Sequence, residues 1–261
     1  MKKISIAGKG GTGKSVITTL LSESLSEKGY SVLVVDSDES NTGLYRMLGF
    51  DTAPKPVMDM FGGERKVWDI LDRLEGDANA DPMVKTLLSE KISLNDISPE
   101  YYLKRGSLRL MSIGKITRPF EGCACPIGKV NSVFLEKLSL NEKEIAIADM
   151  EAGVEHFGRG VERGVDTVII VVEPSFESVS LGTIINTIAR AGGITSIWAI
   201  LNKIPSAPIE KDLSKQCTEH TIDVAGAIRY DPLLVEECLR GKALGESQAR
   251  EDMRKIVARL T

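Results

Sequence analysis

The chain of 261 residues lacks several features that would define its class at once. Aromatic residues make up only 5% of it, and no apolar run approaches the length of a transmembrane helix. The 33 basic residues are nearly balanced by 37 acidic ones, so no strong positive field draws the protein to DNA or anionic lipid. The first apolar stretch is also too short for a signal peptide. We therefore expect a cytoplasmic protein with no stable membrane anchor and no nucleic-acid partner.

Cysteine and histidine are scarce as well. Two histidines exclude a histidine-rich metal store, and four cysteines in a cytosolic chain of this size indicate thiols or metal ligands rather than a disulfide framework. Two of these residues, Cys217 and Cys238, share no motif and are interpreted as structural thiols. The other two belong to a motif described below.

What the chain does contain is a regular alternation of short apolar runs with helix-period segments. This pattern predicts a doubly wound α/β fold, in which a mostly parallel sheet is covered by helices on both faces. A helix is expected over Lys14–Lys28, before Gly29. The predicted strands are Lys3–Ala7, Ser31–Val35, Ser107–Met111, Glu144–Ala148, Asp166–Val172, Ser196–Leu201 and Asp223–Ile228.

The segment from about residue 51 to 105 interrupts this rhythm. It is polar, rich in acidic residues and contains four prolines, at positions 54, 56, 82 and 99. We interpret residues 1–261 as one domain and this segment as an insertion with helices near Val67–Leu74 and Asp81–Leu88. Insertions of this kind often form lids or partner surfaces.

A phosphate-binding loop follows the first predicted strand and precedes the first predicted helix. The sequence matches G-x-x-x-x-G-K-[ST], whose backbone N–H groups cradle phosphate oxygens at a helix N-terminus. Lys14 is expected to reach the β- and γ-phosphates, and the Ser15 hydroxyl to bind Mg²⁺. The predicted nucleotide-binding residues of this loop are Gly8, Lys9, Gly10, Gly11, Thr12, Gly13, Lys14 and Ser15.

Acidic residues come directly after two of the predicted strands. Asp36 and Asp38 follow the second strand, and Asp149 ends a later one. Carboxylates at the carboxyl ends of parallel strands point into the ligand crevice, so Asp36 and Asp149 are predicted to join Ser15 around Mg²⁺. The alternative is that one of the two acids after the second strand only caps a turn, and for Asp36 that alternative stays open.

Residues suited to binding a nucleobase follow the predicted strand Ser196–Leu201. Asn202 offers both a donor and an acceptor, so with Lys203 it is predicted to bind adenine. The stretch Arg229–Pro232, after the next strand, is a further candidate for flanking the base. The guanine-specific Thr/Asn-Lys-x-Asp motif is absent from the sequence.

Cys123 and Cys125 are the most informative feature after the phosphate loop. In an extended chain their sulfurs project to the same side, where two thiolates hold two corners of a tetrahedral site. Two ligands do not make a tight site, but a twofold dimer supplies four. The alternative interpretation is a pair of small apolar residues in a tight turn before Pro126.

The loop sequence K-G-G-T-G-K-S resembles the deviant Walker A group, which includes MinD- and ParA-type ATPases and the nitrogenase iron protein. This resemblance implies an ATP-hydrolysing homodimer in which Lys9 crosses the interface to the partner's phosphates. It also implies that Asp38 is the switch I aspartate that orients the attacking water. Lys14, Asp38 and Lys9 are therefore the predicted catalytic residues.

Three segments together resemble a narrower family. The phosphate loop, Gly122–Pro126 with its Cys-Ala-Cys, and the stretch from Asp149 to His156 are similar to those of nickel-insertion ATPases that mature carbon monoxide dehydrogenase, with a close relative serving acetyl-CoA synthase. The resemblance implies a metallochaperone that uses Mg²⁺ with ATP. Ni²⁺, or Zn²⁺ in its place, would occupy an intersubunit Cys₄ site, and the client would be one of these two nickel enzymes.

Two rival interpretations remain. A positioning ATPase acting on membrane or DNA would use a basic amphipathic C-terminal helix, but the predicted helix from Glu246 to Leu260 offsets its basic residues with acids, and its apolar stripe suits packing on the body of the protein. An ATP-dependent iron–sulfur reductase resembling the nitrogenase iron protein would need two widely separated cysteines per subunit, whereas here Cys123 and Cys125 are clustered.

Overall fold

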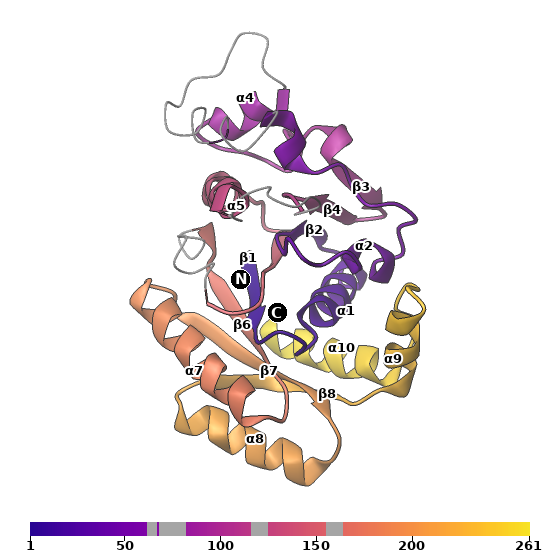
Figure 1. Cartoon of the computed structure of the whole chain (residues 1–261), viewed down its shortest axis with the longest axis vertical. Coiled ribbons are helices and arrows are strands. Elements are labelled where there is room, and N and C mark those ends of the chain that lie inside the picture. The colour runs from indigo at the N-terminus through magenta and orange to yellow at the C-terminus, as the bar shows by residue number, and fades with distance from the viewer. Residues whose placement is uncertain (62–66, 68–81, 116–124, 155–163) are drawn as a thin grey trace.

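The predicted doubly wound α/β fold is confirmed. The computed structural model describes residues 1–61, 67, 82–115, 125–154 and 164–261, and in this part of the chain eight strands form one sheet with the order β3-β4-β2-β5-β1-β6-β7-β8 (Figure 1). All neighbouring strands are parallel except β3 and β4. The strands are β1 (Lys3–Gly8), β2 (Ser31–Asp36), β3 (Tyr102–Arg105), β4 (Leu108–Ser112), β5 (Glu144–Asp149), β6 (Thr167–Val172), β7 (Ser196–Ile204) and β8 (Asp223–Arg229).

Helices cover both faces of the sheet (Figure 1). On one face α1 packs over the apolar side chains of β1, β2 and β5, and α10 packs over β8 and against α1, with α2 and α9 in the same cluster. On the other face α5 packs over β2 and β5, while α7 and α8 pack over β6 and β7. The helices are α1 (Lys14–Glu27), α2 (Leu44–Met47), α4 (Pro82–Leu88), α5 (Cys125–Lys137), α7 (Phe176–Ala191), α8 (Ala207–Glu219), α9 (Pro232–Leu239) and α10 (Gln248–Leu260), with 3₁₀ turns η1 (Val57–Phe61) and η2 (Pro99–Tyr101).

The central strands are buried on both faces, which explains why their sequences are continuous apolar runs rather than alternating ones. All six residues of β6 are buried, for example. All seven predicted strands are present, although β7 continues three residues beyond its predicted end, to Ile204. Because the sheet is parallel, the carboxyl ends of β1, β2 and β5 meet along one edge, and this edge carries the acids and the phosphate loop.

The segment from 51 to 105 differs in part from its prediction. Its last residues form β3, an antiparallel edge strand that the sequence analysis missed, because four residues ending in the exposed Lys104 and Arg105 carry little apolar signal. The predicted helix at Asp81–Leu88 is present as α4. Buried residues of η1 and α4 share a core with β2 and α5. The helix predicted near Val67–Leu74 lies, apart from Val67, outside the described residues.

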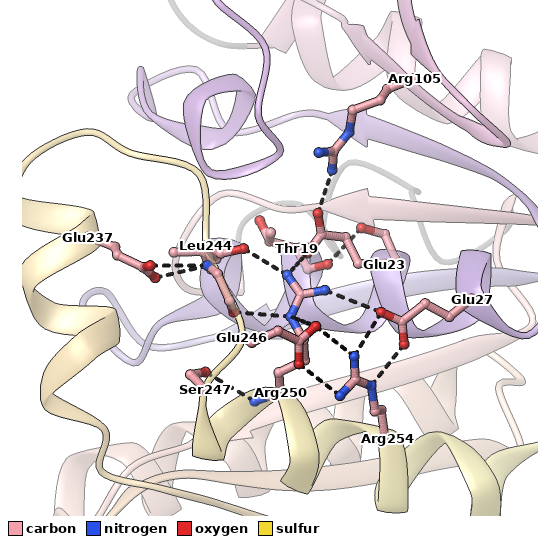
Figure 2. Close-up of polar contacts among 12 residues, drawn as sticks. Thr19, Glu23, Glu27, Arg105, Glu237, Leu244, Glu246, Ser247, Arg250 and Arg254 are labelled. Carbon is pink, nitrogen blue, oxygen red and sulfur yellow. Dashed lines mark hydrogen bonds and ion pairs between the residues drawn. The ribbon is translucent and has the colours of Figure 1, made fainter.

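The C-terminal helix packs on the body of the protein, as its apolar stripe predicted. Ser247 caps α10, and Met253, Ile256 and Val257 are buried against α1 and β8. Charged residues surround this contact, and Figure 2 shows Arg250 and Arg254 of α10 reaching glutamates of α1. No helix in the described part of the chain is long and apolar enough to cross a bilayer.

Candidate functional site: a phosphate loop beside three carboxylates

The phosphate loop connects β1 to α1, and its conformation requires glycine at two points. Gly8 has φ +147°, and a Cβ there would lie 2.6 Å from the Val171 carbonyl oxygen. Gly13 has φ +92°, and a Cβ there would lie 2.4 Å from the side-chain nitrogen of Asn202. Between them Gly11 also has a positive φ, and Thr12 is fully buried. The loop therefore brings its backbone to the N-terminus of α1, where phosphate oxygens bind.

Ser15 and Asp149, both predicted to contact Mg²⁺, are brought together. The Ser15 hydroxyl donates to Asp149 Oδ2 at 2.6 Å, and Thr18 Oγ1 donates to Oδ1 at 3.0 Å. Asn41 Nδ2 donates to the Ser15 hydroxyl at 2.6 Å. Burial raises the pKa of Asp149, against the two hydroxyl hydrogen bonds and the nearby charge of Lys14, which is itself buried. These oxygen donors match the ligands that Mg²⁺ prefers.

Asp36 lies beside this pair, because β2 and β5 place Asp36 and Asp149 in register. Lys115, which follows β4, donates from Nζ to Asp36 Oδ1 at 2.7 Å and to the carbonyl oxygen of Asp38. Burial raises the pKa of Asp36 to about 7, even though the Lys115 ammonium acts in the opposite direction. The Asp36 carboxylate therefore makes an ion pair rather than capping a turn.

The turn-capping role falls instead to Asp38. Its Oδ1 accepts hydrogen bonds from Ser40 N at 2.9 Å, Ser40 Oγ at 2.6 Å and Asn41 N at 3.2 Å. The sequence analysis left this alternative open mainly for Asp36, so the structure assigns it to the other aspartate. Asp38 is nevertheless buried at the same sheet edge as Asp149, close enough for their charges to interact.

Two lysines of the site share one glutamate. Lys9 Nζ lies 3.8 Å from Glu173 Oε1, and Lys203 Nζ lies 2.8 Å from Glu173 Oε2. Lys203, which has φ +58°, also donates to the Gly11 carbonyl oxygen. Lys9 is thus held within its own chain, at the exposed rim of the phosphate loop.

A cavity of about 300 Å³ opens beside the phosphate loop and unites the residues predicted to surround the base. The Asn202 amide nitrogen donates to the Thr12 carbonyl oxygen at 2.7 Å, which leaves its side-chain oxygen as an acceptor for an exocyclic amine. The lining is mostly apolar and includes the half-exposed ring of Tyr230, which suits a stacked base. The lining residues are Gly11, Gly13, Val16, Asn202, Lys203, Arg229, Tyr230, Asp231, Leu234, Val235 and Cys238.

The cysteine motif is only partly described. Cys123 lies outside the described residues, and Cys125 is the first residue of α5. The backbone at Cys125 is therefore helical, whereas the sequence analysis expected an extended chain, and Pro126 occupies the early helical position that favours proline. Among the described residues no three histidine, cysteine, aspartate or glutamate side chains are grouped closely enough to hold a metal ion by themselves. Burial raises the pKa of Cys217 to about 11, in line with its predicted structural role.

Several site residues were not predicted from the sequence. Asn41 and Thr18 complete the hydrogen bonding of Ser15 and Asp149, Glu173 binds the rim lysines, and Lys115 binds Asp36. Lys115 carried a usable signal, because it follows a predicted apolar strand and parallel strands end at one edge. Asn41 carried none, since its position depends on the turn that Asp38 caps.

Residues 4–244 match the family model described as the CobQ/CobB/MinD/ParA nucleotide binding domain. The chain belongs to this family of P-loop, ATP-binding proteins. An uncharacterised ATP-binding protein of Methanocaldococcus jannaschii is 42% identical over 77% of this chain and 78% of its own. The carbon monoxide dehydrogenase accessory protein CooC of Rhodospirillum rubrum is 30% identical over 88% of this chain and 84% of its own.

Solved structures agree with the fold. The septum site-determining protein MinD of Pyrococcus horikoshii, determined with Mg-ADP, has a TM-score of 0.72 and covers 99% of this chain and 95% of its own, at 17% identity. A ParA family ATPase from Chlorobium tepidum has a TM-score of 0.67 at 20% identity, covering 100% of this chain and 98% of its own. At these identities the likeness concerns the fold alone.

Proposed function

We propose that this chain is a homodimeric ATPase that delivers nickel to the active-site cluster of a carbon monoxide dehydrogenase or an acetyl-CoA synthase. The observation that carries the proposal is the combination of the assembled Ser15–Asp149 site with a Cys-Ala-Cys motif in the sequence, whose last residue, Cys125, begins α5. The 30% identity to a carbon monoxide dehydrogenase accessory protein, over most of both chains, supports the choice of client.

The hydrolytic half of the proposal uses the residues at the sheet edge. Lys14 neutralises the β- and γ-phosphates, and Ser15 with Asp149 and Asp36 holds Mg²⁺. Asp38 orients the water that attacks the γ-phosphorus, and the partner's Lys9 stabilises the charge that develops there. Adenine occupies the cavity beside Asn202 and Lys203.

The nickel half uses the symmetry of a dimer. Cys123 and Cys125 supply two thiolates from each chain, and four thiolates complete a tetrahedral site that binds Ni²⁺ or, in its place, Zn²⁺. Metal affinity then depends on how closely the two chains approach. Nucleotide binding changes that approach, so the two ligands are coupled through the dimer.

The C-terminal helix α10 argues against the alternative of a MinD-type positioning ATPase. A membrane-binding helix needs an apolar face available to lipid, whereas Met253, Ile256 and Val257 of α10 are buried against the body of the protein. Arg254 is also bound to glutamates rather than directed outward for anionic headgroups. The positioning function is therefore our second candidate.

The test is equilibrium dialysis of reduced protein against Ni²⁺ under anaerobic conditions, with and without ATP. We expect one Ni²⁺ per two chains, and loss of this binding in the Cys123→Ala/Cys125→Ala double variant. Cys217→Ala, which removes a buried thiol elsewhere, is the matched control and should bind nickel as the parent does. Undiminished binding in the double variant, or no binding by the parent, would remove the metal from the proposal and leave the ATPase.

A further inference from the structure

Lys115 lies inside the nucleotide site although it belongs to no phosphate-binding motif. Its side chain is 17% exposed and reaches back over the carboxyl end of β2, where Nζ binds Asp36 Oδ1 and the Asp38 carbonyl oxygen. The backbone leading to it is fixed as well, because Ile113 N donates to the Asp36 carbonyl oxygen at 3.0 Å. The ammonium is therefore held close to the carboxyl ends of β2 and β4.

Lys115 lies where its positive charge compensates the negative charge of neighbouring carboxylates. β4, β2 and β5 place Ser112, Asp36 and Asp149 in register, so two carboxylates lie on adjacent strands with Asp38 nearby. The charges of Asp149 and Asp38 both act on Asp36. Lys14 provides the positive charge near Asp149, and Lys115 provides it at Asp36.

Lys115 also fixes the backbone that carries Asp38. The turn after β2 is attached at three points, since Ser37 N donates to the Asp149 carbonyl oxygen at 3.0 Å, Lys115 holds the Asp38 carbonyl oxygen, and Asn41 Nδ2 binds the Ser15 hydroxyl. Between these points the Asp38 carboxylate accepts the hydrogen bonds of its own turn. Removing the Lys115 contacts releases the attachment at Asp38 itself and leaves those at Ser37 and Asn41.

We propose that Lys115 is a positioning residue for ATP hydrolysis: it holds the turn of Asp36 and Asp38 so that Asp38 lies where the attacking water must be oriented. The inference rests on the proposed ATPase function but not on the nickel site. Lys115 acts through Asp38 rather than on the phosphates, so its loss should affect kcat and leave ATP affinity largely intact.

The test compares ATP hydrolysis by Lys115→Met, Lys115→Arg and the parent, with Mg-ADP binding measured alongside. We expect kcat of Lys115→Met to fall on the order of 10²-fold, the scale of a misplaced catalytic group, while KM and the Mg-ADP affinity change less than about threefold. Lys115→Arg keeps the charge and should recover part of the rate. Lys104→Met, an exposed lysine on β3, is the matched control, and Asp38→Ala sets the lower limit of the rate.

The outcomes separate this inference from the function on which it rests. A parent that hydrolyses no ATP contradicts the proposed function itself. An active parent with an equally active Lys115→Met variant overturns the positioning role alone. A variant whose kcat and Mg-ADP affinity fall together, with no recovery in Lys115→Arg, also overturns it, because Lys115 would then support nucleotide binding or folding.

Discussion

Helix α1 has a charged cluster at each end, and the two clusters differ in how their charges are matched. At its start, three carboxylates (Asp36, Asp38 and Asp149) face two lysines (Lys14 and Lys115). Toward its end, the glutamates at 23, 27 and 246 face the arginines at 105, 250 and 254, which bind them through multiple ion pairs (Figure 2).

This difference distinguishes the cluster at the end of α1, which stabilises the fold, from the cluster at its start, which is suited to binding a ligand. In the second cluster each buried charge has partners, and the Arg254 hydrogen bonds keep the pKa of Glu27 below its usual range. In the first cluster burial raises the pKa values of both Asp36 and Asp149, and the charges of Lys115 and Lys14 offset this only in part. Such a deficit suits a site that receives a divalent cation with its ligand.

The largest effect is expected from breaking the matched cluster at its buried arginine. Arg250, 7% exposed, donates to Glu23, to the Leu244 carbonyl oxygen at 2.7 Å and to the Gly245 carbonyl oxygen at 3.1 Å. Arg250→Met leaves the two carbonyl oxygens without this donor and Glu23 with Arg105 alone, so the free energy of unfolding should fall by about 3–5 kcal/mol. Urea denaturation followed by circular dichroism measures this change.

Two further variants sharpen that measurement. Arg254→Ala removes a partly exposed arginine from the same cluster and should cost no more than about 1 kcal/mol. Glu23→Leu in the Arg250→Met background removes a carboxylate that keeps only the half-exposed Arg105 as its partner, and should return part of the lost stability. Equal losses for Arg250→Met and Arg254→Ala would contradict the distinction between buried and exposed pairs.

An intermediate effect is expected from the unmatched cluster, and it depends on pH. The pKa of Asp36 is about 7 in the folded protein and near 4 in an unfolded chain, so between these values the folded state binds more protons. Its contribution to stability is therefore highest below about pH 4 and is lost as the pH rises through 7. This pH dependence of stability is opposite in sign to that of a salt-bridged surface carboxylate, whose contribution is lost as the pH falls.

Asp36→Asn cannot ionise, so its stability relative to the parent should increase as the pH rises from 5 to 8. The expected change in this difference is on the order of 1–3 kcal/mol, because the parent loses about 1.4 kcal/mol per pH unit up to the Asp36 pKa of about 7. Urea denaturation without nucleotide or Mg²⁺, at several pH values, measures it. A difference that stays flat over this range would mean that Asp36 ionises normally.

The two clusters also differ in how far the sequence predicted them. The phosphate loop was predicted from its motif, and Asp36, Asp38 and Asp149 from their places after strands whose carboxyl ends converge in a parallel sheet. Asn41 was missed because its contacts depend on the path of the chain after β2, whereas Lys115 was missed although its place after a predicted strand pointed to the same edge of the sheet. The arginine–glutamate cluster could not be predicted from the sequence, since Glu23 and Arg250 are 227 positions apart and meet only when α10 packs on α1.

The smallest effect is expected at the rim of the unmatched cluster. Lys9 is partly exposed and lies 3.8 Å from Glu173, so this ion pair is weak. If the partner's phosphates receive Lys9 in an ATP-bound dimer, Lys9 must first leave Glu173. Glu173→Gln removes that competition and should tighten ATP-dependent dimerisation by less than about fivefold, as measured by sedimentation velocity.

Glu177→Gln provides the matched control, because Glu177 is an exposed acid in the first turn of α7, four residues further along the chain. It makes the same change in net charge, so a general reduction of repulsion between two acidic chains would tighten both variants equally. Tightening confined to Glu173→Gln assigns the effect to the release of Lys9 and Lys203. Weaker dimerisation in Glu173→Gln would instead place Glu173 among the residues that hold the two chains together.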